Sequence, residues 1–336
     1  MSRIPAPAFL RLIAAALAAA ALCPAPACAQ TVQSITPSTP DLGTVVSGAS
    51  GNTVFRVSSS SGAITRVSGT GVRLTAGNSR SLVTIACNTT ACRNSALNVR
   101  VGSIGSPSGR AAALTNFTVT AGTAVFSVAP TGTNPVSFRI QGIPQGSTAT
   151  FWVGADFPIQ GDTSTAATGN ASSGFYVYVA VAPTVPTTGS TAGLAVAKVF
   201  RPINIAQATG LSFGKVVRPS SGSGTVSINA ASGVRSVTGT GTVGLSSPAP
   251  TRASYTVSGE GGQAFSLSVP TSFTMTGPGT QLTVSLVPTA SGAQTLSSAL
   301  GSAGTFGFGV GGSFPITSST VSGAYQGSYS ITVQYN

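Results

Sequence analysis

The sequence predicts an all-β protein built from two tandem antiparallel β-sandwich domains. Three observations carry this prediction. Short runs of β-branched and aromatic residues alternate with Ser and Thr, as expected for sheets with one packed face and one wet face. The chain's 42 Gly and 21 Pro supply the residues that bound these runs. After the first 29 residues, no segment keeps a helical period over twelve residues.

The charge inventory argues against an enzyme. The 336 residues include 16 Lys and Arg, 4 Asp and Glu and no His, so charged residues make up 6% of the chain, against about 25% in an ordinary soluble domain. Without His there is no Ser-His-Asp or Cys-His machinery and no histidine metal ligand. Four acids leave little for paired-carboxylate catalysis or a calcium cage. We therefore expect no catalytic residues, no cofactor and no metal site.

Residues 1–29 have the pattern of a secretory signal peptide. Arg3 and Arg11 form the basic region, 12–23 is a short apolar run, and Ala27-Cys28-Ala29 supplies a cleavage site. The run is shorter than the roughly 20 residues that span a bilayer, so no transmembrane segment is expected. The signal predicts export to the periplasm, the cell surface or the medium. Lipid attachment at Cys23 or Cys28 is the alternative.

Cleavage would leave two cysteines, Cys87 and Cys92, and 14 basic against 4 acidic residues. In an oxidising compartment the two cysteines are expected to form a disulfide that closes a small loop. The basic residues are scattered and not interleaved with aromatic residues, so nucleic acid is not an expected partner. The basic residues could bind an anionic surface polysaccharide, or they could lie on solvated strand faces where they discourage aggregation.

The strand candidates follow in chain order. In the first half they are 54–57, 82–85, 97–101 and 138–140, and in the second half 225–228, 255–257, 265–269, 282–286 and 329–333. Each is short and bounded by Gly, Pro, Ser or Asn.

The two halves repeat each other. Residues 41–46 align with 212–217, the Gly-Thr-Gly at 69–71 aligns with 239–241, 137–142 with 254–259, and 174–179 with 327–332. The offset falls from about 171 to about 117, which predicts an insertion of roughly fifty residues between 75 and 130, carrying Cys87 and Cys92. The expected domains are therefore 30–182 and 194–336, joined by a Pro/Thr/Gly linker at 183–193.

The second half resembles a family of exported bacterial β-domains known as domain of unknown function 4402. The matching residues are 211–214, 255–259, 309–312 and the ending 323–336. The resemblance covers about 200–336 well and the first half only weakly. Because the family has no assigned chemistry, it implies location and fold but no activity.

The ending also resembles the C-terminal signature of pilus subunits assembled by a periplasmic chaperone and an usher. The signature residues here are Gly323, the alternating Tyr329, Ile331 and Val333, and the penultimate Tyr335. The resemblance implies an immunoglobulin-like, pilin-like sandwich that lacks one strand, which a chaperone or a like subunit would add. An ordinary closing strand of a self-sufficient sandwich would show the same alternation, so both interpretations stay open.

Two functions follow as hypotheses. The first is a non-catalytic structural or adhesive component of the cell surface, fimbria-like and assembled by strand complementation. Because residues 30–37 do not alternate and include Pro37, such a subunit would sit at the end or tip of a fibre. The second is a monomeric secreted or periplasmic binding module for carbohydrate or an anionic surface polymer.

Overall fold

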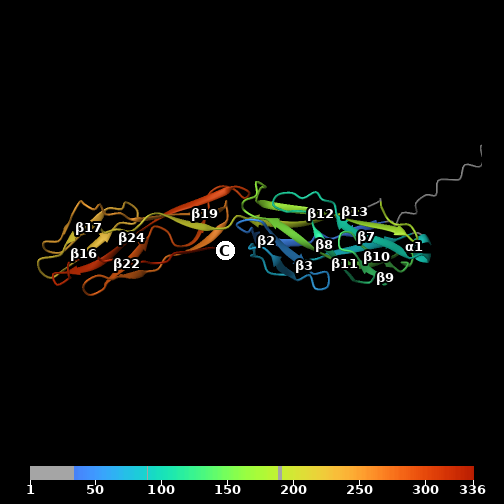
Figure 1. Ribbon diagram of the computed structural model, residues 1–336, viewed down its shortest axis with the longest axis horizontal. Helices are drawn as coiled ribbons and strands as arrows, with labels where there is room; N and C mark the ends of the chain where they lie inside the picture. Colours follow the sequence, from blue (N-terminus) through green and yellow to red (C-terminus); the bar gives the residue numbers. More distant parts are fainter. Residues whose placement is uncertain (1–33, 89, 188–190) are drawn as a thin grey trace, which may run out of the picture.

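The computed structural model describes residues 34–88, 90–187 and 191–336; the expected signal peptide, 1–29, lies outside these ranges. Nearly all of the described regular structure is β, in several antiparallel sheets, which confirms the predicted class. Figure 1 shows two sandwiches end to end, with the C-terminus lying where they meet.

The N-terminal sandwich has two facing sheets. The first has the order β1-β6-β11-β3-β4, with β8 also beside β11, and the second has the order β5-β2-β13-β12-β7-β10-β9. The strands of the first sheet are β1 (Ser34–Pro37), β3 (Asn52–Val57), β4 (Ile64–Ser68), β6 (Ser81–Cys87), β8 (Thr115–Ala121) and β11 (Ser147–Gln160). Those of the second are β2 (Asp41–Val46), β5 (Val72–Arg73), β7 (Leu97–Ser103), β9 (Phe126–Thr131), β10 (Val136–Ile140), β12 (Gly169–Val181) and β13 (Thr191–Phe200). Side chains from both sheets, Phe55, Phe151 and Phe175 among them, form one core.

The C-terminal sandwich repeats this plan. Its larger sheet has the order β14-β19-β24-β16-β17, with β22 beside β24 and β21 beside β22; β23-β20-β25 and β15-β18 form two small sheets. The strands are β14 (Asn204–Thr209), β15 (Val216–Val217), β16 (Ser223–Ile228), β17 (Arg235–Val237), β18 (Val243–Gly244), β19 (Ala253–Glu260), β20 (Ala264–Ser268), β21 (Ser272–Met275), β22 (Leu282–Pro288), β23 (Gly292–Thr295), β24 (Ala303–Thr317) and β25 (Thr332–Tyr335). Phe265, Val310 and Phe314 lie in its core.

The domain boundary lies later than the sequence suggests. β13 spans residues assigned to the linker and to the second domain, yet it pairs with β12 and β2 of the N-terminal sheet. Its residues are alternately buried, because both neighbours hold it against the N-terminal core. The Pro/Thr segment after β12 is therefore a connection within the first domain, and the sandwiches meet between Phe200 and Asn204. β13 also pairs in parallel with β2, an exception to the antiparallel prediction.

Strand pairing confirms the first part of the repeat. Val45 and Val46 of β2 pair with Arg73 and Val72, and 171 positions later Val216 and Val217 of β15 pair with Gly244 and Val243. β3 pairs with the end of β11 as β16 pairs with the end of β24. Both long strands carry Phe-Pro-Ile at this place, at 157–159 and at 314–316, a repeat that the sequence comparison missed.

The third sequence match, 137–142 with 254–259, is wrong. β10 pairs with β7 and β9, whereas β19 pairs with β14 and β24 and so has the position of β6. β7 and β8 likewise have counterparts in β20 and β22, which lie beside the counterparts of β12 and β11. There is no single insertion of fifty residues. Strands rich in Gly, Ser and Thr resemble one another by composition alone. The correct alignment of the two domains therefore depends on which strands pair in the structure.

The expected disulfide is present. Cys87 ends β6 and is bonded to Cys92 in the short helix α1 (Thr90–Asn94), which leads toward β7. Both cysteines are buried in the N-terminal core. The bond closes the β6–β7 connection, a position present in both domains.

A buried carboxylate joins β3 to β11. Arg56 donates two hydrogen bonds to Asp156 at 2.7 and 2.8 Å, and Asn116 donates a third at 2.8 Å. Burial alone would raise the pKa of Asp156, but the hydrogen bonds from Arg56 and Asn116 and the charge of Arg56 outweigh it, so the pKa is lower than usual.

We expect Asp156→Asn to lower the free energy of unfolding at pH 7 by about 2 kcal/mol, since hydrogen bonds to a charged group are lost. Because the folded-state pKa is depressed, this contribution is present above the unfolded-state value of about 3.9 and is lost as pH falls through the folded-state value. Urea unfolding at pH 7 and pH 3 checks this. If the variant keeps the full acid sensitivity of the parent, other groups account for it.

Candidate functional site: an open groove in the C-terminal sandwich

β13 fills the space between two edges of the N-terminal sandwich. Residues 191–199 of β13 pair with β12, and the end of β13 pairs in parallel with β2. Its inward residues are Gly193, Ala195, Ala197 and Val199, all buried. The strand thus supplies backbone partners on both sides and a row of small apolar side chains to the core.

The corresponding place in the C-terminal sandwich is an open groove of about 620 Å³. One wall is the segment 211–218, which contains β15 and matches β2; the other is 320–327, which matches the start of β12. We call this space the groove. The apolar residues that line it are Leu211, Phe213, Val216, Phe273, Met275, Leu282, Phe314, Ile316, Val321 and Tyr325.

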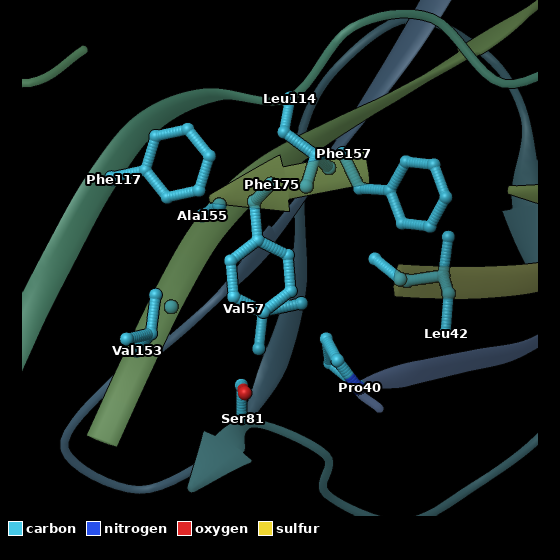
Figure 2. A pocket seen from close by; sticks show the side chains of 12 residues that line it. Pro40, Leu42, Val57, Ser81, Leu114, Phe117, Val153, Ala155, Phe157 and Phe175 are labelled. Atoms are coloured by element: carbon cyan, nitrogen blue, oxygen red, sulfur yellow. The ribbon is translucent and has the colours of Figure 1, made fainter. Parts of the chain in front are cut away.

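The N-terminal counterpart of the groove is nearly filled. A void of about 20 Å³ remains between the sheets, and Figure 2 shows Pro40, Leu42, Phe157 and Phe175 around it. Pro40 and Leu42 correspond to Leu211 and Phe213, while Phe157 corresponds to Phe314 in the repeated Phe-Pro-Ile. Ala195 of β13 also lines the void. In the N-terminal domain, where β13 is in place, space for about one water remains. In the C-terminal domain, where the described residues supply no such strand, the groove is open.

The backbone along the second wall has few strand partners. β12 pairs with β13 over nine residues, Gly169 to Val177. Between 320 and 331 the described structure shows strand pairing at one place, the bridge from Gln326 to Thr276, and regular pairing begins only at β25. Unpaired strand edges of this kind are templates for pairing with another chain.

Gly323 begins the signature ending and lies in the wall of the groove. Its φ of +155° is unfavourable for other residues, and an added Cβ would meet the ring of Pro278. The structure thus gives Gly323 a local reason to be glycine.

Tyr329, Ile331, Val333 and Tyr335 all pack, partly buried, against the C-terminal core. Val333 and Tyr335 pair with Leu267 and Phe265 of β20, so this end of the chain completes its own small sheet. Tyr329 accepts a hydrogen bond from Tyr255 at 3.0 Å, and burial raises the pKa of Tyr329 well above the usual value. The alternating residues therefore flank the groove and do not fill it.

Tyr335 also ties the end of β25 to the junction of the domains. Its hydroxyl donates to the carbonyl of Arg201 at 2.9 Å and accepts from the Glu260 amide at 2.7 Å. Its ring lies against that of Phe200, with centroids 5.4 Å apart. Burial is the main cause of its raised pKa, so the phenol stays neutral and keeps its donor.

Glu260, the acid of the second domain, is fully buried at this junction. Its carboxylate accepts from the amide and guanidinium of Arg201 at 3.2 and 3.1 Å and from the Gly301 amide at 2.5 Å. Sequence reasoning assigned no role to Glu260. The sequence feature that could have identified Glu260 is that it is the single acid in the last 174 residues of the chain.

One face of the Trp152 ring, an aromatic surface on which a sugar could stack, is covered. The guanidinium of Arg80 lies 3.8 Å from the centroid of this ring. The pair is a cation–π contact on the outer surface of the first sheet. It favours packing over a stacking platform.

The family comparison agrees with this division of the chain. Residues 203–335 match a family model. Its description is "Domain of unknown function (DUF4402)". The match begins just after the junction, so the DUF4402 region is the sandwich that carries the groove, and the N-terminal sandwich lies outside it.

No curated protein matches the chain. Among solved structures, the chain is similar to one described as the CsuC–CsuE chaperone–tip adhesion subunit pre-assembly complex from archaic chaperone-usher Csu pili of Acinetobacter baumannii. The two share 11% identity with a TM-score of 0.27, over 90% of this chain and 99% of that one.

Proposed function

We propose that the protein is a non-catalytic, exported component of the bacterial surface, structural or adhesive, that is completed by strand addition. Its second domain would accept an extended strand from another polypeptide into the groove. The observation that carries the proposal is the contrast between the two domains: the same place in the fold holds β13 in one and is open in the other.

The strand in the first domain shows what such an occupant would look like. β13 directly precedes the second domain, because β14 begins four residues after β13 ends. Seen from the second domain, β13 is an N-terminal extension inserted into the sandwich before it. A following subunit whose extension entered the groove would repeat this arrangement, and this is how a fibre of such domains would grow.

This arrangement supports a terminal or tip position. The first sandwich already contains β13, so an additional subunit would attach at the second sandwich. A periplasmic chaperone that protects the groove before assembly and a like subunit that replaces it are the proposed partners. The Cys87–Cys92 disulfide supports export, since such bonds persist in oxidising compartments.

Recognition of a surface polysaccharide has weaker support. The described surface has a second hollow beside Asp41, Asn170 and Lys198, lined by hydroxyl and small side chains. It lacks an aromatic ring for a sugar face, and Arg80 covers one face of Trp152. In the parts of the chain that the structure describes, no cluster of three or more acids and cysteines could hold a metal ion. Nor, within the same residues, is any helix both long and apolar enough to cross a membrane.

A synthetic peptide with the sequence of β13, residues 191–200, tests the proposal. We expect it to bind the full chain saturably, measured by fluorescence anisotropy, and to slow amide hydrogen exchange in 211–218 and 320–327. The control peptide exchanges the inward and outward residues, which turns the apolar row away from the groove, and should not bind. Absence of binding, or binding that leaves both walls exchanging as before, would contradict strand addition.

A further inference from the structure

The first wall of the groove differs in charge from its N-terminal counterpart, β2. Two cations, Lys215 and Arg218, lie on the first wall of the groove. At the matching positions of β2 and the residue after it, the N-terminal domain has Thr44 and Ser47. Both cations are exposed, and the acid nearest in sequence, Glu260, is buried at the junction.

β13 shows which residue of an inserted strand would face Lys215. In the parallel pairing with β2, Lys198 of β13 is the partner of Thr44. Partnered residues of neighbouring parallel strands project from the same face of the sheet, about 4.8 Å apart. A strand placed in the groove as β13 is placed in the first domain would therefore set its Lys198-equivalent residue beside Lys215.

Arg218 adds to the positive charge at the same end. Its counterpart, Ser47, donates from its amide and hydroxyl to the carbonyl of Phe200, the last residue of β13. Arg218 instead donates to the carbonyl of Thr320 at 2.7 Å, across the end of the groove. The end of an inserted strand would therefore meet two cations, where the end of β13 meets a threonine and a serine.

We propose that the strand recognised by the groove carries a carboxylate, Asp or Glu, on its outward face at the position of Lys198, with small apolar residues on its inward face. This inference rests on the strand-addition function proposed above and specifies the chemistry of the partner. A lysine at that position, as in β13 itself, would weaken binding without preventing it. The groove would thus discriminate against the chain's own strand sequence and favour a partner of opposite charge.

Three peptides that differ only at position 198 test the inference: the β13 sequence and its K198Q and K198E forms. Against the full chain in low salt, we expect K198E to bind about three- to tenfold more tightly than the β13 sequence, with K198Q between them. The difference should shrink as salt is raised, because the charges are exposed.

The Lys215→Glu variant of the full chain provides the matched control. Its preference should invert, so that the β13 sequence binds more tightly than K198E, while K198Q binds the two proteins alike. If all three peptides bind both proteins equally at every salt concentration, the charge inference is wrong and strand addition stands. If no peptide binds either protein, strand addition fails and the inference fails with it.

Discussion

A copy of residues 182–200 fused after Asn336 is expected to raise the melting temperature of the second domain by about 10 °C or more. The copied segment contains β13 and the connection that precedes it. In the first domain this connection allows β13 to turn back along β12. In the fusion it would allow the copy to turn back along the second wall of the groove and fill it in cis.

The gain has two sources. The inward Ala and Val side chains of the copy and the groove lining, including Phe213 and Phe314, leave water together, which is worth about 25 cal/mol per Å² of apolar surface. Backbone amides of the second wall that lack a strand partner also gain one. A total of about 3 kcal/mol suffices, because 1 kcal/mol shifts the melting temperature of a domain of this size by about 3–5 °C.

Differential scanning calorimetry of the fusion and the parent measures the effect. The control fusion carries the same segment with the inward and outward residues of β13 exchanged, and it should melt with the parent. The first fusion should also no longer bind the free β13 peptide, since the groove is occupied. An unchanged melting temperature together with retained peptide binding would show that the copy does not enter the groove.

The fold class was available from the sequence because strand periodicity is local. Runs such as Leu282–Leu286 alternate whatever their neighbours are, and the turns between strands carry their own Gly and Pro signals. The disulfide was predictable for a similar reason: Cys87 and Cys92 are the pair left after the expected cleavage. The signature ending, from Gly323 to Tyr335, lies in the same domain as the groove, and Gly323 lines it; its role in strand addition stays a prediction.

The groove itself could not be predicted, because it is a property of strand order. A strand such as β13 belongs to whichever sheet pairs with it, and the Pro-rich segment before it looks like a linker between domains. The pairing with β12 and β2 is what assigns β13 to the first domain. Once β13 belongs to the first domain, the second domain has no described strand at the corresponding place. The wall 211–218 was visible as a repeat of β2, but its alignment with 41–46 does not say what lies beside it.

The junction needed a contact between residues far apart in sequence. Arg201 and Glu260 are 59 residues apart, and Thr168, which accepts from Arg201 at 2.6 Å, comes from the other domain. The ion pair is therefore part of the surface where the sandwiches meet. Tyr335 connects this surface to β25.

Arg201→Ala is expected to lower the free energy of unfolding by about 3 kcal/mol, because it leaves Glu260 buried without its cation. The side chain of Glu260 has no solvent exposure, while that of Arg201 has 24%. Water can therefore replace part of what Arg201 provides, but it cannot easily reach the carboxylate. Denaturant unfolding at pH 7 gives the magnitude, and small-angle X-ray scattering reports whether the domains stay end to end.

The double variant Arg201→Met with Glu260→Gln separates the ion pair from packing. Removing both charges together removes the uncompensated buried charge, so the double variant should be more stable than Arg201→Ala alone, although it has one more substitution. A double variant as unstable as the single one would mean that the lost hydrogen bonds from Arg201 to Glu260 and Thr168, and not the uncompensated charge, account for the instability. In either case Tyr335→Phe should loosen the end of β25, because the Glu260 amide and the Arg201 carbonyl both lose the hydroxyl between them. If the junction holds β25 in place beside the groove, this loosening will also weaken binding of the β13 peptide.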